Sequence, residues 1–229
     1  WMLAGFVHGV LNTDNINVTG ESFDYGPWRF LPTYDPKFTA AYFDHSGLYA
    51  YGRQPDTLAW NLARLAESLL PLAPKADLET ALSEFAPAFR AALRAAMRRR
   101  LGLGEGGDPE LGDTVWSFLL ESQVPFERFF FDWYGGVASA GRAARSPVAS
   151  LYASEAFARV RAVFDGYIQP VGADHAYFAG DAPCTMLVED VEAVWSAIAE
   201  RDDWTVLAAK LDDIATMGEA MGNYPAQGS

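Results

Sequence analysis

Apolar residues at helical spacing begin just after Pro55 and limit the fold more than any other feature of the sequence. Asp56 or Thr57 can cap a helix that runs to about Leu70, where a proline-containing turn follows. The apolar stripe recurs every three or four residues, at Leu58, Leu62, Leu65 and Leu69. A chain with this pattern buries one face of each helix, so the sequence predicts a mainly α-helical body.

A second, longer helix is predicted from Asp77 to about Leu101. Its expected buried face consists of Leu78, Leu82, Phe85, Phe89, Leu93 and Met97. Pro87 lies inside this helix and predicts a kink or a break near Phe85 and Ala86, because proline removes one hydrogen bond and clashes with the preceding turn.

The remaining sequence predicts further helices separated by glycine-rich and polar segments. They are expected at residues 109–123, 126–134, 154–167, 189–201 and 204–221. Ser154 or Ser150 can cap the third of these. Residues 104–108 are interpreted as a linker, and the small and polar residues 137–149 as a mobile loop.

Composition excludes several classes of function. The chain has 229 residues, half of them apolar, which is ample for a sizeable core. A formal net charge of −13 argues against general binding to nucleic acid or to anionic membranes, which need clustered Lys and Arg. No apolar run approaches the roughly 20 residues that span a bilayer. The single cysteine, Cys184, excludes an internal disulfide and is consistent with a reducing compartment.

The first fifty residues are irregular and bring together three side chains of chemical interest, Asp14, Asn15 and Asp24. The segment between Asn15 and Asp24 contains a Thr-Gly break and predicts a small β-hairpin. Because a hairpin folds its ends together, Asn15 and Asp24 can face one point in space. Magnesium is usually held by one or two protein oxygens together with substrate phosphates and water, so this pair predicts a Mg²⁺ site.

Three sequence blocks carry a resemblance to a known family: HGVLNTDN at residues 8–15, DYGPWRFLPTYDP at 24–36, and YAYGRQPDTLAWNLARLAESLLPL at 49–72. They resemble selenoprotein O, a family of protein adenylyltransferases with a protein-kinase-like fold. The clear match runs from about Trp1 to Leu72, and a weaker one continues through the following helix.

This resemblance implies that the chain is the C-terminal portion of such an enzyme, a kinase-like C-lobe whose N-lobe lies upstream and is absent here. It implies transfer of AMP from ATP to Ser, Thr or Tyr hydroxyls of proteins. Asp14 would be the general base; Asn15 and Asp24 would bind Mg²⁺, or Mn²⁺. Asp24, in the place of the Asp of a kinase DFG motif, would also bind the nucleotide. We expect one domain over residues 1–229, with catalytic and metal loops in 1–50, helices in 51–103 and a C-terminal helical extension in 108–229.

Two other functions remain open. One is a non-catalytic pseudokinase scaffold or binding module, and the other is an ordinary phosphotransferase. In protein kinases the base precedes the metal-binding Asn by five residues, whereas Asp14 directly precedes Asn15. Without its N-lobe, the fragment alone is expected to be inactive. The expected partners are ATP and proteins with accessible hydroxyls, with no nucleic acid and no membrane. The expected compartment is the cytoplasm in bacteria, or the mitochondrion in a eukaryote.

Several other polar residues have a simpler structural interpretation. His8 is expected to hold the catalytic loop by a hydrogen bond. Asp44, His45 and Ser46 are adjacent in sequence, and a nucleophile relay is assembled from distant segments, so a hydrolase triad is not expected. Asn12, Tyr25, Arg53 and Asn61 either line the site or serve in packing, and Arg94–Arg100 is expected to be a solvated helix end.

Overall fold

The computed structural model describes residues 1–21, 24–104, 106–107, 109–167 and 173–222. The chain divides into two compact units. The first combines Trp1–Leu31 with Asp35–Ala95, and the second combines Pro32–Tyr34 with Ala96–Ser229. The expectation of a single domain over residues 1–229 stays a prediction.

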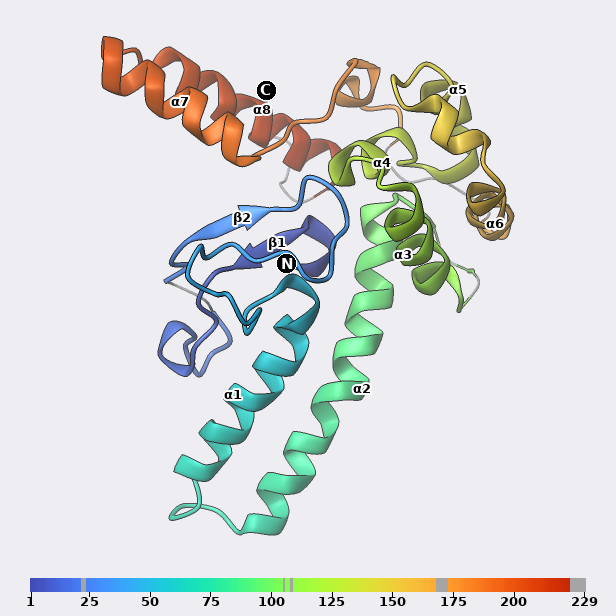
Figure 1. The fold of residues 1–229 in the computed structure, drawn as a ribbon. Coiled ribbons are helices and arrows are strands. Elements are labelled where there is room, and N and C mark those ends of the chain that lie inside the picture. Colours follow the sequence, from blue (N-terminus) through green and yellow to red (C-terminus); the bar gives the residue numbers. More distant parts are fainter. Residues whose placement is uncertain (22–23, 105, 108, 168–172, 223–229) are drawn as a thin grey trace. The chain divides into compact units, whose positions relative to one another are not determined.

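Helices dominate both units, as the apolar spacing predicts (Figure 1). The helices are α1 (Gln54–Ser68), α2 (Lys75–Arg100), α3 (Leu111–Ser122), α4 (Phe126–Asp132), α5 (Ala140–Ala143), α6 (Glu155–Phe164), α7 (Val188–Arg201) and α8 (Thr205–Ala220). The strands are β1 (Phe6–His8) and β2 (Trp28–Phe30). The mainly α-helical fold class is therefore confirmed, and the likeness to a kinase C-lobe stays a prediction. None of the described helices is both long enough and apolar enough to cross a bilayer.

The small sheet lies in the first unit and pairs its two strands antiparallel, with Val7 opposite Arg29. Phe6 packs against the rings of Tyr25, Trp28 and Phe30, at centroid distances of 5.6, 6.4 and 5.5 Å. This sheet is not the hairpin expected from residues 16–23. There, Asn17 N–H donates to the Glu21 carbonyl at 2.8 Å and closes a turn, while Ser22 and Phe23 lie outside the described residues.

Helices α1 and α2 follow the sheet segment, and Figure 1 shows α2 returning in the opposite direction after the turn at residues 69–74. The apolar stripes are placed as predicted, but most of their residues are only half-buried, and only Met97 at the end of α2 is fully buried. Helix α2 continues through Pro87, so the alternative of a break there is wrong.

The second unit has an aromatic core. Helix α3 packs on α6, and four phenylalanines of α4 are buried between their neighbours: Phe126, Phe129, Phe130 and Phe131. Helix α6 is capped by Ser154, whose Oγ accepts a hydrogen bond from the Phe157 N–H at 3.2 Å, as expected for a capping serine.

Residues 137–149 differ from the sequence-based expectation of a mobile loop. They contain most of a short 3-10 helix, Gly136–Ser139, and all of α5. Arg142 stabilises this segment, because its guanidinium donates to the Tyr134 carbonyl and lies 4.8 Å from the centre of the Phe178 ring. The neighbouring linker, residues 104–108, contains Glu105 and Asp108, which lie outside the described residues.

Candidate functional site

The loop that carries the predicted metal ligands lies between Gly9 and Pro27. These two residues approach each other closely, so the loop begins and ends at the same place. A Cβ atom added to Gly9 would lie 1.9 Å from the Pro27 carbonyl oxygen, so no other residue fits without moving the backbone. A Cβ on Gly26 would lie 3.5 Å from Cγ2 of Val10. The two ends of the loop are therefore in contact, beside the sheet formed by β1 and β2.

Asn15 is placed at the start of this loop by a short 3-10 helix, Thr13–Asn15. Its Nδ2 donates to the Val10 carbonyl at 2.7 Å, and its side chain is largely buried. This hydrogen bond uses the donor end of the amide. The other end, Oδ1, is the atom through which an Asn ligates a cation.

Asp24 lies at the other end of the loop and is exposed. Its Oδ1 accepts a hydrogen bond from the Gly26 N–H at 3.0 Å, which is an Asx-turn. This turn fixes the direction of the carboxylate. A carboxylate has about four lone-pair sites, so it retains capacity to bind a cation.

Val10 and Gly26 link the two predicted ligands. Asn15 bonds to the backbone of Val10, Asp24 bonds to the backbone of Gly26, and a Cβ added to Gly26 would be in van der Waals contact with the Val10 side chain. Within the described parts of the chain, no group of three or more His, Cys, Asp or Glu is placed to hold a metal. An amide and one carboxylate form no such group, so Mg²⁺ at this pair would need phosphate oxygens and water as its other ligands.

Asp14, the predicted base, is exposed on the same 3-10 helix as Asn15. The negative charge of Asp14 acts electrostatically on the hydroxyl of Tyr49. The pKa of Tyr49 is raised first by burial, and then by the negative charges of Asp44 and Asp14. The Tyr49 hydroxyl donates to Oδ1 of Asn12, so this tyrosine contacts the segment that presents Asp14. Tyr49 has no sequence signal of its own, since 37 residues separate it from Asn12.

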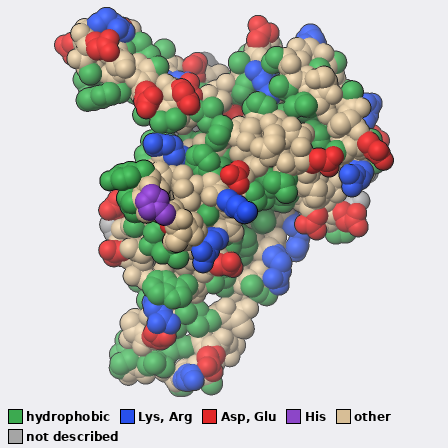
Figure 2. Space-filling view, viewed as in Figure 1, with side chains coloured by type: hydrophobic (Ala, Val, Ile, Leu, Met, Phe, Trp, Pro, Cys, Tyr) green, Lys and Arg blue, Asp and Glu red, His purple; other side chains and the backbone are tan. Residues whose placement is uncertain are grey.

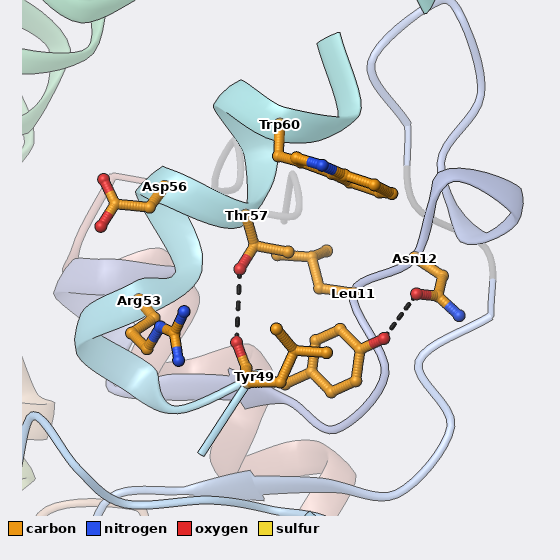
Figure 3. A pocket seen from close by; sticks show the side chains of 8 residues that line it. Leu11, Asn12, Tyr49, Arg53, Asp56, Thr57 and Trp60 are labelled. Carbon is orange, nitrogen blue, oxygen red and sulfur yellow. Dashed lines mark hydrogen bonds between the residues drawn. The ribbon is translucent and has the colours of Figure 1, made fainter. Parts of the chain in front are cut away.

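A pocket of about 320 Å³ opens beside Asn12 (Figure 3). Its lining residues are Leu11, Asn12, Leu48, Tyr49, Arg53, Asp56, Thr57 and Trp60. For four residues the sequence left two roles open, lining the site or packing. Of these four, Asn12 and Arg53 line this pocket. Asn61 instead packs, because it is buried and donates to the Leu11 carbonyl at 3.1 Å. Tyr25 is exposed and packs edge-on against Phe6.

His8 has the structural role that the sequence suggests. It is fully buried, and its Nδ1 accepts a hydrogen bond from the Val10 N–H at 3.2 Å, which holds the start of the loop. The buried Gln54 supports the same strand, accepting from the His8 N–H and donating to the Phe6 carbonyl, both at 3.0 Å. Gln54 was not predicted, because nothing in the local sequence distinguishes it from an exposed helix residue.

The buried position of His8 predicts a pH dependence of stability. Burial lowers its pKa below the ordinary 6.5, and the nearby Asp24 opposes this only in part. The unfolded chain therefore binds the proton more readily, so stability falls as pH falls below about 6.5, until the lower folded-state pKa is reached. The slope is at most about 1.4 kcal/mol per pH unit for one proton. Chemical unfolding between pH 5 and 8 measures it.

The exposed His45 provides the matched control for this prediction. His45→Gln should keep the pH dependence of the wild-type protein, whereas His8→Gln should reduce it. An NMR titration of the His8 imidazole that gives a pKa above 6.5 contradicts the prediction, whether or not the His8 variant folds.

The other polar clusters have structural roles. The Asp44 carboxylate accepts hydrogen bonds from the N–H groups of Leu48 and Tyr49, both at 2.8 Å, and shapes a loop. Arg100, at the end of the arginine cluster, pairs with Glu127 and lies over the ring of Phe130. Cys184 is a half-buried thiol whose pKa is raised chiefly by burial.

A family model and the individual relatives of this chain point to the same protein family. The family model of the protein adenylyltransferase SelO matches residues 1–215. The chain is 38% identical over 218 residues to the protein nucleotidyltransferase YdiU of Gloeobacter violaceus, covering 89% of this chain and 44% of that protein. It is 36% identical over 234 residues to YdiU of Synechocystis, covering 89% and 46%. It is 47% identical over 135 residues to YdiU of Trichormus variabilis, covering 58% and 28%. The chain thus spans less than half the length of these relatives.

Proposed function

Because the chain belongs to the SelO family of protein adenylyltransferases, we propose that it is the C-terminal part of an enzyme that transfers AMP from ATP to Ser, Thr or Tyr hydroxyls of proteins. The observation that carries the proposal is the loop between Gly9 and Pro27. It presents the amide of Asn15, the carboxylate of Asp24 and the exposed carboxylate of Asp14 within one short segment of the first unit.

Asn15 and Asp24 are assigned to a Mg²⁺ ion, or Mn²⁺, that accompanies the triphosphate of ATP. Hard cations of this kind prefer carboxylate, amide and phosphate oxygens, which are the donors this pair and a nucleotide offer. When bound, the ion would neutralise charge on the phosphates. Asp24 contributes the stronger electrostatic attraction because it is charged, and Asn15 contributes a fixed direction through its bond to Val10.

Asp14 is assigned to the acceptor hydroxyl. Its carboxylate takes the proton as the hydroxyl oxygen attacks the α-phosphorus; a new O–P bond forms, the bond to the β-phosphate breaks, and pyrophosphate leaves. Exposure of Asp14 supports this role, because a carboxylate that serves a protein substrate must be reachable from solvent.

The part of the relatives that this chain does not span is expected to supply the remaining contacts to the nucleotide. We therefore propose that residues 1–229 alone do not catalyse transfer, and that the longer protein does. The labelled-ATP experiment therefore requires the longer protein.

Incubation of that protein with ATP labelled on either the α- or the γ-phosphate tests the proposal. Label from the α-phosphate on protein hydroxyls, with release of pyrophosphate, is the expected result. Label from the γ-phosphate instead identifies a phosphotransferase, and label from neither identifies a non-catalytic scaffold; both contradict the proposal. The fragment, run in parallel, should transfer neither label.

A further inference from the structure

The pocket beside Asn12 is built from two segments of the first unit, the loop before Asp14 and the start of α1 with its preceding turn. Figure 3 shows the indole of Trp60 across one side and the phenol ring of Tyr49 across the other, with Leu11 and Thr57 between them. The two rings and the leucine give the pocket an apolar interior, closed at one edge by α1.

The polar groups around this interior have hydrogen-bond partners in the same loop and helix. The guanidinium of Arg53, the one cation among the lining residues, donates to the Gly47 carbonyl at 3.5 Å. The Tyr49 hydroxyl donates to Asn12, and the Thr57 hydroxyl donates to the Leu48 carbonyl at 3.5 Å. The Asp56 carboxylate is directed away from the gap between the two rings (Figure 3). A ligand in the gap between the two rings therefore meets mainly carbon atoms, and this part of the pocket favours an apolar group over a charged one.

Large apolar side chains also reach the surface around the pocket. Trp60 is 54% exposed and Leu48 45%, and in the preceding loop Tyr42 is 90% and Phe43 50% exposed. Asp44 ties that loop to the pocket through its bonds to Leu48 and Tyr49. Figure 2 shows hydrophobic side chains at the surface of this unit among charged ones. Leu48 and Trp60 both line the pocket, so exposed apolar surface meets at its mouth, and contiguous exposed apolar surface is typical of protein-binding sites.

The pocket lies next to the proposed base. Asn12, which lines it, is two residues before Asp14, and Tyr49 lies within electrostatic reach of the Asp14 carboxylate. An extended polypeptide advances about 3.3 Å per residue. A segment whose hydroxyl is presented to Asp14 therefore places a neighbouring side chain, one to three positions away, beside the pocket.

On the basis of the proposed function, we propose that this pocket binds an aromatic or large aliphatic side chain of the acceptor protein, close in sequence to the hydroxyl that is modified. Its volume of about 320 Å³ is at the low end for small-molecule pockets, which range over about 300–1,000 Å³. That size fits one large side chain better than a whole nucleotide. Trp60 and Tyr49 are then specificity-determining residues for the acceptor.

Binding of two peptide pools to the longer protein tests this inference. Each fluorescent pool has a central Ser, Thr or Tyr; the three positions on each side carry Phe and Leu in one pool and Ala in the other. We expect the wild-type protein to bind the Phe and Leu pool about tenfold more tightly, from burial of one large apolar side chain. Trp60→Ala should abolish this preference. Trp195→Ala, the same substitution at a residue that is 64% exposed on α7, should retain it.

Two outcomes overturn the inference: equal binding of both pools by the wild-type protein, or an unchanged preference in Trp60→Ala. A Trp60→Ala protein that instead loses affinity for ATP identifies the pocket as a nucleotide site and also overturns it. Peptide binding needs no catalytic turnover, so failure of the pocket and failure of AMP transfer, measured with labelled ATP, are separate results.

Discussion

Asp24→Ala in the full-length protein should lower AMP transfer at least about a thousandfold, the scale of losing a group that stabilises charge in phosphoryl-type transfer. The physical reason is that Asp24 is the charged member of the proposed metal pair, and the amide of Asn15 cannot offset the charge of a divalent cation. The stability of the protein should change little, because Asp24 is exposed and its carboxylate accepts its hydrogen bond from the Gly26 N–H at the surface. Initial rates with α-labelled ATP and a thermal melt measure both effects.

Asp35 offers a matched control, because its exposed carboxylate makes the same kind of turn and accepts from the Lys37 N–H at 2.8 Å. Asp35→Ala therefore removes an equivalent hydrogen bond and should leave transfer near the wild-type rate. If Asp24→Ala transfers AMP as fast as Asp35→Ala does, Asp24 is not the metal anchor.

Phe118→Ala should produce the largest loss of stability, about 3–5 kcal/mol in the free energy of unfolding of the second unit. Phe118 on α3 is 1% exposed and packs against Phe129 and Phe157, at ring-centroid distances of 5.6 and 5.2 Å. Removing the ring leaves a cavity where α3 packs on α6. Hydrogen exchange of the α3 and α6 amides, measured at increasing urea concentrations, reports the loss in this unit.

The control for this prediction is Trp195→Ala, which removes an exposed ring and should change stability by no more than about 0.5 kcal/mol. Protection of the α3 and α6 amides in Phe118→Ala equal to that in Trp195→Ala contradicts the assignment of Phe118 to the core.

The helices were predictable because apolar residues recur every three or four positions along each of the longer ones. The leucine spacing locates α1, and the longer stripe ending at Met97 locates α2, whose predicted residues are the less exposed ones of that helix. The break at Pro87 was not found, because the long helix tolerates one missing hydrogen bond. The four-residue helix α5 was missed because it is too short for one full apolar repeat.

Strand pairing was less accessible to sequence reasoning. The Thr-Gly break correctly marks a turn near Gly20, and local alternation suggested that the flanking residues form the hairpin. The observed strands instead pair Phe6 with Phe30, which are far apart in sequence, and aromatic packing around Phe6 stabilises the pairing. Such non-local contacts leave no periodic trace in a single sequence.

The candidate site likewise combines residues that are close together in the sequence with residues that only the fold brings near. Asp14, Asn15 and Asp24 belong to one short segment, so residue type and spacing drew attention to them, and the resemblance carried by HGVLNTDN gave them their expected roles. Tyr49 reaches the start of this segment at Asn12, and Gln54 reaches the preceding strand β1, through contacts that span 37 to 48 residues of sequence; only the folded chain reveals them. The roles of all three selected residues stay predictions.

The close contact between Gly9 and Pro27 has a practical consequence for spectroscopy. It separates the fixed stem of the loop from its tip, where Val18 is 83% exposed and Gly20 has open space around it. A fluorophore attached through Val18→Cys would therefore project into solvent without disturbing the stem, and within this chain the half-buried Cys184 is the one competing thiol. Such a label would report arrival of a cation or nucleotide at the neighbouring ligands in real time.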